Sequence, residues 1–147
     1  MIEVLIAQEQ DTHAVDEPRL VAACRAVLQS AGFSAGEISI AVVNDEQMHE
    51  LNRKYLDHDY PTDVLSFVLD EGDGRLEGEI IVSADYAARE ANRFGWTMMD
   101  ELLLYVIHGS LHLVGYDDQS PDAKALMREQ EIHFLRQFGL EPRFDEA

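Results

Sequence analysis

Residues 102–108 of this 147-residue chain read LLLYVIH, and the fold must be arranged around this apolar segment. These apolar side chains would occupy every side of a helix, which is typical of a helix buried on most of its surface. Thr97, followed by Asp100 and Glu101, is a suitable start for this helix, and Gly115 is a suitable end. The rest of the chain must therefore supply the elements that cover this helix.

The flanking sequence alternates between strand and helix signals. Strands are predicted at residues 1–6, 38–43, 63–69 and 80–83, and the turn Glu71-Gly72-Asp73-Gly74 joins the last two into a hairpin. Helix starts are predicted at Asp16 with Pro18, Asn44 with Gln47, Ser83, and Ser120-Pro121-Asp122. The resulting βαβαββααα order predicts an α+β fold, with a small mixed sheet of about four strands covered by helices. We expect one domain over residues 1–147.

Composition narrows the possible functions. The chain has 29 acidic and 11 basic residues, a formal net charge of −18, and 46% hydrophobic residues. Such a charge disfavours tight, unaided binding to nucleic acid, although it does not exclude a local basic site. The start of the chain lacks the features of a signal peptide, no apolar run is long enough for a membrane span, and Cys24 is the single cysteine. We therefore expect a cytoplasmic protein without a membrane partner.

His108 and His112 lie four residues apart in the predicted central helix. Their imidazoles should project from one face about one turn apart, a spacing that lets both reach a single metal ion. The spacing alone is a weak signal, because two core or capping histidines would produce it equally well. The apolar surroundings strengthen it, since a buried imidazole needs a partner for each nitrogen.

A third ligand follows the helix. Gly115 can adopt a left-handed conformation that reverses the chain, and Asp118 can then fold back over the ion; Asp117 is the competing candidate. Three protein ligands leave a coordination position open, which is typical of a catalytic zinc site. Metzincin proteases share the spacing but carry a glutamate as general base directly after the first histidine. Gly109 occupies that position here, which disfavours protease chemistry.

The segment HGSLHLVGYDD at residues 108–118 closely resembles the signature of the YbeY family of endoribonucleases and rRNA maturation factors. The resemblance extends over roughly residues 38–139. It includes Leu51-Asn52, DYPTDVLSF at 59–67, GEIIVS at 78–83, Glu101-Leu102, Met127 and Glu131-Ile132.

This resemblance implies an α+β fold, a bound zinc ion, hydrolysis of single-stranded RNA, and roles in 16S rRNA maturation and ribosome quality control. Ribosomal RNA and ribosomal proteins would then be partners. The sequence departs from the family pattern at Asp118, where a histidine is usual, and at Leu56, where many members have an arginine thought to contact phosphate. A carboxylate ligand also suits manganese or iron, so the metal preference can differ.

Several residues are candidates for catalysis beside the metal ligands. Arg53 and Lys54 lie close to Leu56 and could replace the missing cation, while His58 could assist proton transfer. Arg89 and Arg93 form another possible phosphate-contacting pair. By resemblance, Asp63 orients a metal-bound histidine or a substrate group, and Ser66 lines the cleft.

The hypothesis that follows is metal-dependent phosphodiester hydrolysis, in which water or the 2′-hydroxyl of the substrate attacks phosphorus. The main alternative is a metal-stabilised ribosome-assembly module that binds RNA or protein without cutting. The net charge and Leu56 favour this alternative, whereas the open ligand pattern favours an enzyme.

Overall fold

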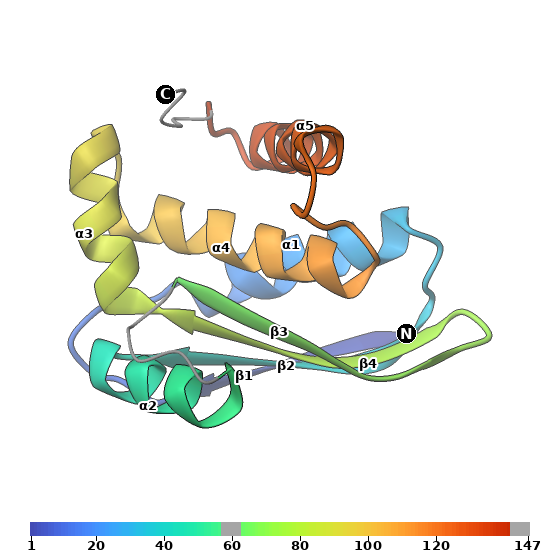
Figure 1. The fold of residues 1–147 in the computed structure, drawn as a ribbon, viewed down its shortest axis with the longest axis horizontal. Coiled ribbons are helices and arrows are strands. Elements are labelled where there is room, and N and C mark those ends of the chain that lie inside the picture. The colour runs from blue at the N-terminus through green and yellow to red at the C-terminus, as the bar shows by residue number, and fades with distance from the viewer. Residues whose placement is uncertain (57–62, 142–147) are drawn as a thin grey trace.

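A computed structural model of the protein describes residues 1–56 and 63–141. Its elements follow the predicted βαβαββααα order, which confirms the α+β class (Figure 1). They are β1 (Ile2–Gln8), α1 (Glu17–Ser30), β2 (Ala35–Val43), α2 (Asp45–Leu56), β3 (Val64–Gly72), β4 (Arg75–Ser83), α3 (Ala84–Phe94), α4 (Met98–Leu113) and α5 (Pro121–Gln137).

The four strands form one mixed sheet in the order β1-β2-β4-β3. Strands β1, β2 and β4 are parallel, and β3 pairs antiparallel with β4 through the predicted hairpin. The hairpin turn consists of Asp73 and Gly74, with φ angles of 50° and 75°. Positive φ at both positions matches the strand twist of a two-residue hairpin and explains the Asp-Gly pair. Strand β3 therefore lies at an edge of the sheet.

The predicted strands were too short. The sequence predicted a strand at 80–83, whereas β4 begins at Arg75, and β2 begins at Ala35 rather than at residue 38. In the added part of β4, buried Leu76 lies between the exposed Arg75 and the half-buried Glu77. Backbone pairing continues through this part of the strand although charged side chains alternate with the buried one. The length of the continuous apolar run therefore underestimates the length of the strand.

Helix α4 lies at the centre of the fold, as the sequence predicted. Figure 1 shows α1 and α4 along one face of the sheet, α5 on the outer side of α4, and α2 on the opposite face. Helix α4 contacts α1, α3, α5, β3 and β4. Leu102, Leu103, Val106 and Ile107 are fully buried in the main core. Within the part of the chain that the structure describes, no helix is long and apolar enough to cross a membrane.

The predicted capping residues begin the helices. Asn44 and Gln47 form a reciprocal capping pair, in which each side chain accepts from the other residue's backbone N–H at 3.0 and 2.8 Å. Thr97 and Asp100 form the same arrangement before α4. These caps satisfy N–H groups that have no partner inside the helix. The start points of the helices could therefore be predicted more accurately than the ends of the strands.

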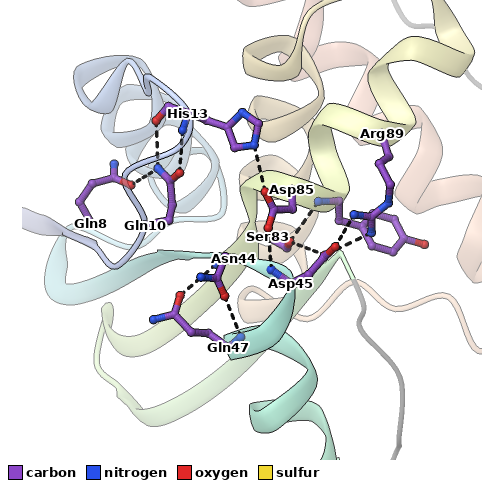
Figure 2. A network of polar contacts seen from close by, with 10 residues as sticks. Gln8, Gln10, His13, Asn44, Asp45, Gln47, Ser83, Asp85 and Arg89 are labelled. Carbon is purple, nitrogen blue, oxygen red and sulfur yellow. Dashed lines mark hydrogen bonds and ion pairs between the residues drawn. The ribbon is translucent and has the colours of Figure 1, made fainter.

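A polar network ties α2 and α3 together where the parallel strands end (Figure 2). Asp85 accepts from the backbone N–H of Asp45 at 2.9 Å and lies 3.0 Å from Nε2 of His13. Arg89 in turn binds the carboxylate of Asp45 with both terminal nitrogens. The network fixes the loops that follow β1 and β2 against the start of α3. Arg89 thus has a structural role here, on the side of its helix that faces α2.

The approach of α4 to the sheet depends on Gly109. A Cβ atom at this position would lie 2.8 Å from Cγ2 of Ile80, 3.0 Å from Oγ of Ser66 and 3.1 Å from Cγ2 of Val64. The Ser66 hydroxyl also donates to the Gly109 carbonyl at 3.2 Å. The helix therefore touches β3 and β4 here through its backbone. This contact leaves no room for the glutamate that a metzincin protease carries at the corresponding position.

We expect Gly109→Ala to destabilise the fold despite the better helix propensity of alanine. Overpacking costs typically 1–3 kcal/mol, and the gain from replacing a helical glycine is about 1 kcal/mol, so a net loss of about 1 kcal/mol, and at most roughly 2 kcal/mol, is expected. Urea unfolding of the metal-free protein measures it. Gly72→Ala is the control, because no atom lies within 4 Å of a Cβ there. A Gly109→Ala protein as stable as the wild type would disprove the packing argument.

Candidate metal centre

The two predicted histidines meet at the C-terminal end of α4. Their Nε2 atoms are 3.0 Å apart, and the rings form an edge-to-face pair with centroids 4.6 Å apart. Two nitrogen ligands of a tetrahedral zinc ion would be about 3.3 Å apart, given zinc–nitrogen distances of 2.0–2.1 Å. Both side chains are half-buried, so an ion between them would be open to solvent on one side. The arrangement fits one metal ion held by both imidazoles.

Glu131, on α5, holds the first histidine in place. Its Oε2 lies 2.6 Å from Nδ1 of His108, so the protonated Nδ1 donates to the carboxylate and Nε2 is turned toward His112. Only 5% of the Glu131 side chain is exposed, which makes this a largely desolvated contact. A carboxylate in this position is typical of metal-binding histidines, because it fixes the tautomer and raises the basicity of the ligand nitrogen.

The protein shifts the pKa values of the two imidazoles in opposite directions. Burial acts to lower the pKa of His108, but the hydrogen bond and charge of Glu131, together with the charges of Asp63 and Asp118, outweigh it, and the pKa is raised. Burial and the neighbouring charge of His108 lower the pKa of His112. A neutral His112 is thus favoured at neutral pH, and a neutral imidazole is the form that binds a metal.

The reversal of the chain at Gly115 brings Asp118 to the histidines. Gly115 has φ of 106°, and its N–H and that of Tyr116 donate to the carbonyls of His112 and Leu111 at 3.1 and 3.0 Å. Ligand atoms of His108, His112 and Asp118 all lie within 4.8 Å of one another, so these three could hold a metal ion. Asp117 instead accepts from the backbone N–H of Gln119 at 3.0 Å, within the turn itself.

Two clefts meet at this group. One, here called the β3 cleft, runs along residues 64–68 of β3 to His112. The other, here called the α4–α5 cleft, lies between these helices and the end of α3, and it includes Glu101, Lys124, Arg128 and Glu131. Asp63, His108 and Asp118 line both clefts. The candidate metal centre therefore lies at the junction, where a long substrate can pass on both sides of it.

The other predicted residues lie in different places. Ser66 lines the β3 cleft as expected. Arg53 and Lys54 are exposed near the end of α2, where Arg53 pairs with Glu50, and neither is among the described residues that line the two clefts. His58 and the side chain of Leu56 lie outside the part of the chain that the structure describes. The catalytic roles of Arg53, Lys54 and His58 stay predictions.

The sequence indicates Glu131 only through the family resemblance and does not predict its contact with His108. A signal was present, however. Met127, Phe134 and Leu135 form the buried stripe of α5, and Glu131 occupies a position within this stripe. A carboxylate at an otherwise apolar helical position needs a buried partner. The partner could not be identified from the sequence, because the packing of α5 on α4 selects it.

Comparison with known proteins gives the family. The family model for endoribonuclease YbeY matches residues 5–139. The chain belongs to this family. Relatives named endoribonuclease YbeY include those of Chlorobaculum tepidum, 38% identical over 121 residues, and Bacillus licheniformis, 36% identical over 146 residues. These matches cover 82% and 88% of this chain, and 88% and 92% of the respective relatives.

A third family member, from Rhodopirellula baltica, is 41% identical over 112 residues, which is 75% of this chain but only 58% of that relative. The fold is also similar to the solution structure of a Thermotoga maritima protein, with a TM-score of 0.63 and 26% identity, covering 100% of this chain and 97% of the other. The recognised family and the α+β prediction are therefore confirmed.

We expect Glu131→Gln to weaken metal binding about 10- to 100-fold, the usual effect of removing a carboxylate that orients a ligand histidine. Titration calorimetry against a competing chelator measures it. Glu129→Gln is the matched control, because Glu129 is exposed on the same helix. In the metal-free protein the raised pKa of His108 should also fall in Glu131→Gln, as followed by imidazole NMR signals. Unchanged metal affinity would show that Glu131 does not position the ligand.

The same contact makes the stability of the metal-free protein depend on pH. Because the folded-state pKa of His108 is raised, its ion pair with Glu131 stabilises the fold at acid pH. That contribution is lost as the pH rises through the raised value. Metal affinity has the opposite dependence and decreases toward acid pH, since protons compete for the ligand nitrogens.

Proposed function

We propose that the chain is a metal-dependent endoribonuclease specific for single strands, acting in 16S rRNA maturation and ribosome quality control in the cytoplasm. The observation that carries this proposal is the His108, His112 and Asp118 group at the junction of two clefts, in a chain of the endoribonuclease YbeY family. An open site between two clefts suits cleavage within a strand, because the chain of the substrate can continue on both sides.

The metal we propose is zinc, held by two imidazoles and one carboxylate. A divalent ion bound there would lower the pKa of a water ligand and polarise a phosphodiester oxygen. The described residues prepare the site for it: Glu131 directs Nε2 of His108, and the lowered pKa of His112 keeps that imidazole neutral. The exposed position of Asp118 leaves the third ligand adaptable, so manganese or iron are alternative ions.

Protease chemistry lacks support at this site. The metzincin-like alternative needs a glutamate after the first histidine, and even the Cβ atom of a side chain at residue 109 would lie only 2.8 Å from Cγ2 of Ile80. The remaining alternative is a metal-stabilised assembly module that binds the ribosome without cutting RNA. The net charge of −18 favours this module, because a polyanionic substrate is repelled by most of the surface.

Arg53, Lys54 and His58 remain the proposed catalytic residues from the sequence. The support for these roles is position in the sequence. All three residues lie within a few positions of Leu56, and residues 57–62 lie shortly before the strand that lines the β3 cleft. The cations would stabilise the negative charge that develops on the phosphate, and His58 would transfer a proton.

One experiment separates the enzyme from the assembly module. Cleavage of a single-stranded rRNA fragment is compared for the zinc-loaded wild type, a chelated sample, His112→Ala and the control His133→Ala, whose histidine is exposed on α5. We expect cleavage by the wild type and the control only, with a loss of at least about 100-fold in the other two, because the metal supplies the main electrostatic stabilisation. Equal cleavage in all four samples excludes a metalloenzyme. Absence of cleavage by the loaded wild type favours the assembly module.

The identity of the third ligand has its own test. We expect Asp118→Asn to weaken zinc binding by about tenfold or more, whereas Asp117→Asn leaves it nearly unchanged, because a neutral amide is a poor zinc ligand. Both substitutions remove one negative charge, so general electrostatics affects them equally. Chelator competition measures the two affinities. The reverse order would identify Asp117 as the ligand.

A further inference from the structure

The α4–α5 cleft contains a pair of basic residues that the fold places beside the candidate metal centre. Lys124 and Arg128 lie four residues apart on α5 and both line this cleft, together with His108 and Asp118. Side chains at this spacing project from the same helical face. No basic residue of the described chain lines the β3 cleft. The two cations therefore mark one side of the junction.

We propose that Lys124 and Arg128 bind a backbone phosphate of the single-stranded substrate next to the phosphodiester at the metal centre. The proposal rests on the proposed function and adds the direction in which the strand leaves the site. The phosphate backbone continues into the α4–α5 cleft, and the β3 cleft receives the other part of the strand.

Most other cations of the described chain are already bound to groups of the protein. Arg19 and Arg25 donate to backbone carbonyls, which fixes them to neighbouring elements. Carboxylates of the protein bind a further set, which comprises Arg53, Arg75, Arg89, Arg93 and Arg136. Lys124, by contrast, is exposed, and its ammonium forms no ion pair within residues 1–56 and 63–141. A lysine in a cleft without an internal acceptor is suited to an external anion.

The charge of the cleft supports the assignment. Asp63, Glu101, Asp118 and Glu131 bring four carboxylates to this cleft. Two of them are satisfied within the protein, since Glu131 contacts His108 at 2.6 Å and Glu101 accepts from Nε1 of Trp96 at 2.9 Å. A divalent ion and the two cations would offset the four negative charges. A phosphate could then enter despite the acidic surface.

Arg128 also contacts Glu131, which places its side chain close to the candidate metal centre. Its Nη1 lies 3.5 Å from Oε1 of Glu131, whose other oxygen holds His108. Arg128 and the candidate metal ligand His108 thus contact the same carboxylate, so a phosphate bound by Arg128 would lie near that ligand. For the same reason, a change at Arg128 can disturb the ligand as well as the substrate. Lys124 has no such contact, so it provides the cleaner test.

The test compares binding of a single-stranded 2′-O-methyl oligoribonucleotide to the zinc-loaded proteins by fluorescence anisotropy at several salt concentrations. The variants are Lys124→Gln and, as matched control, Arg136→Gln. Both remove one positive charge from α5, but Arg136 pairs with Glu141 and is not among the described residues that line either cleft. Zinc affinity and cleavage of single-stranded RNA are measured for the same samples.

We expect Lys124→Gln to weaken binding about fivefold at low salt, as for an exposed ionic contact. The slope of log affinity against log salt should fall by about 0.7, the value for one lost phosphate contact on a single strand. Zinc affinity should stay unchanged, and Arg136→Gln should change binding less than twofold. Equal weakening by the two variants would show that only net charge matters and would overturn the proposal. Absence of probe binding to the wild type would overturn it too.

The outcomes also separate this proposal from the proposed function. If Lys124→Gln cleaves and binds RNA as well as the wild type does, the endoribonuclease function is supported and the phosphate site is excluded. Binding that depends on Lys124 without any cleavage would support the phosphate site and favour a module that binds RNA without cutting it.

Discussion

The close packing of α4 on the sheet at Gly109 positions the candidate metal centre relative to the sheet. With no side chain between them, the helix backbone lies directly against β3 and β4. This contact places His108 and His112 at the edge of β3, where the helix leaves the core. The glycine that permits this packing also occupies the position at which a metzincin protease carries its general base. Gly109 therefore both permits the close contact of α4 with the sheet and leaves the site without the general base of a metzincin protease.

The candidate metal centre is built from three segments that differ in how deeply they are buried. Its histidines belong to the most buried helix of the fold, and Glu131 ties the first of them to α5 through a largely desolvated contact. Asp118 follows a glycine turn and is exposed. An ion bound there would have two firmly positioned ligands and one adaptable ligand. Such a site can accept ions with different geometric preferences.

The chain is strongly acidic, yet it belongs to an endoribonuclease family whose substrate, RNA, is also negatively charged. A net charge of −18 repels RNA at long range, and salt screens this repulsion over about 8–10 Å at physiological ionic strength. Within that distance the charges that line the clefts determine whether RNA is attracted or repelled. The described lysine and arginine side chains that line the α4–α5 cleft both come from α5, so this helix supplies the carboxylate that contacts His108 and the local positive charge together.

The α+β order, the buried central helix and the histidine pair could be predicted from the sequence, because each depends on local periodicity, capping residues or spacing within one helix. The sequence also indicated Asp118 through Gly115. It underestimated β2 and β4, since pairing extends beyond the apolar runs. The contact of Glu131 with His108 and the position of Lys124 and Arg128 in the same cleft depend on the tertiary structure. These contacts join α5 to α4 across their packed faces, and no sequence spacing specifies how two helices are placed against each other.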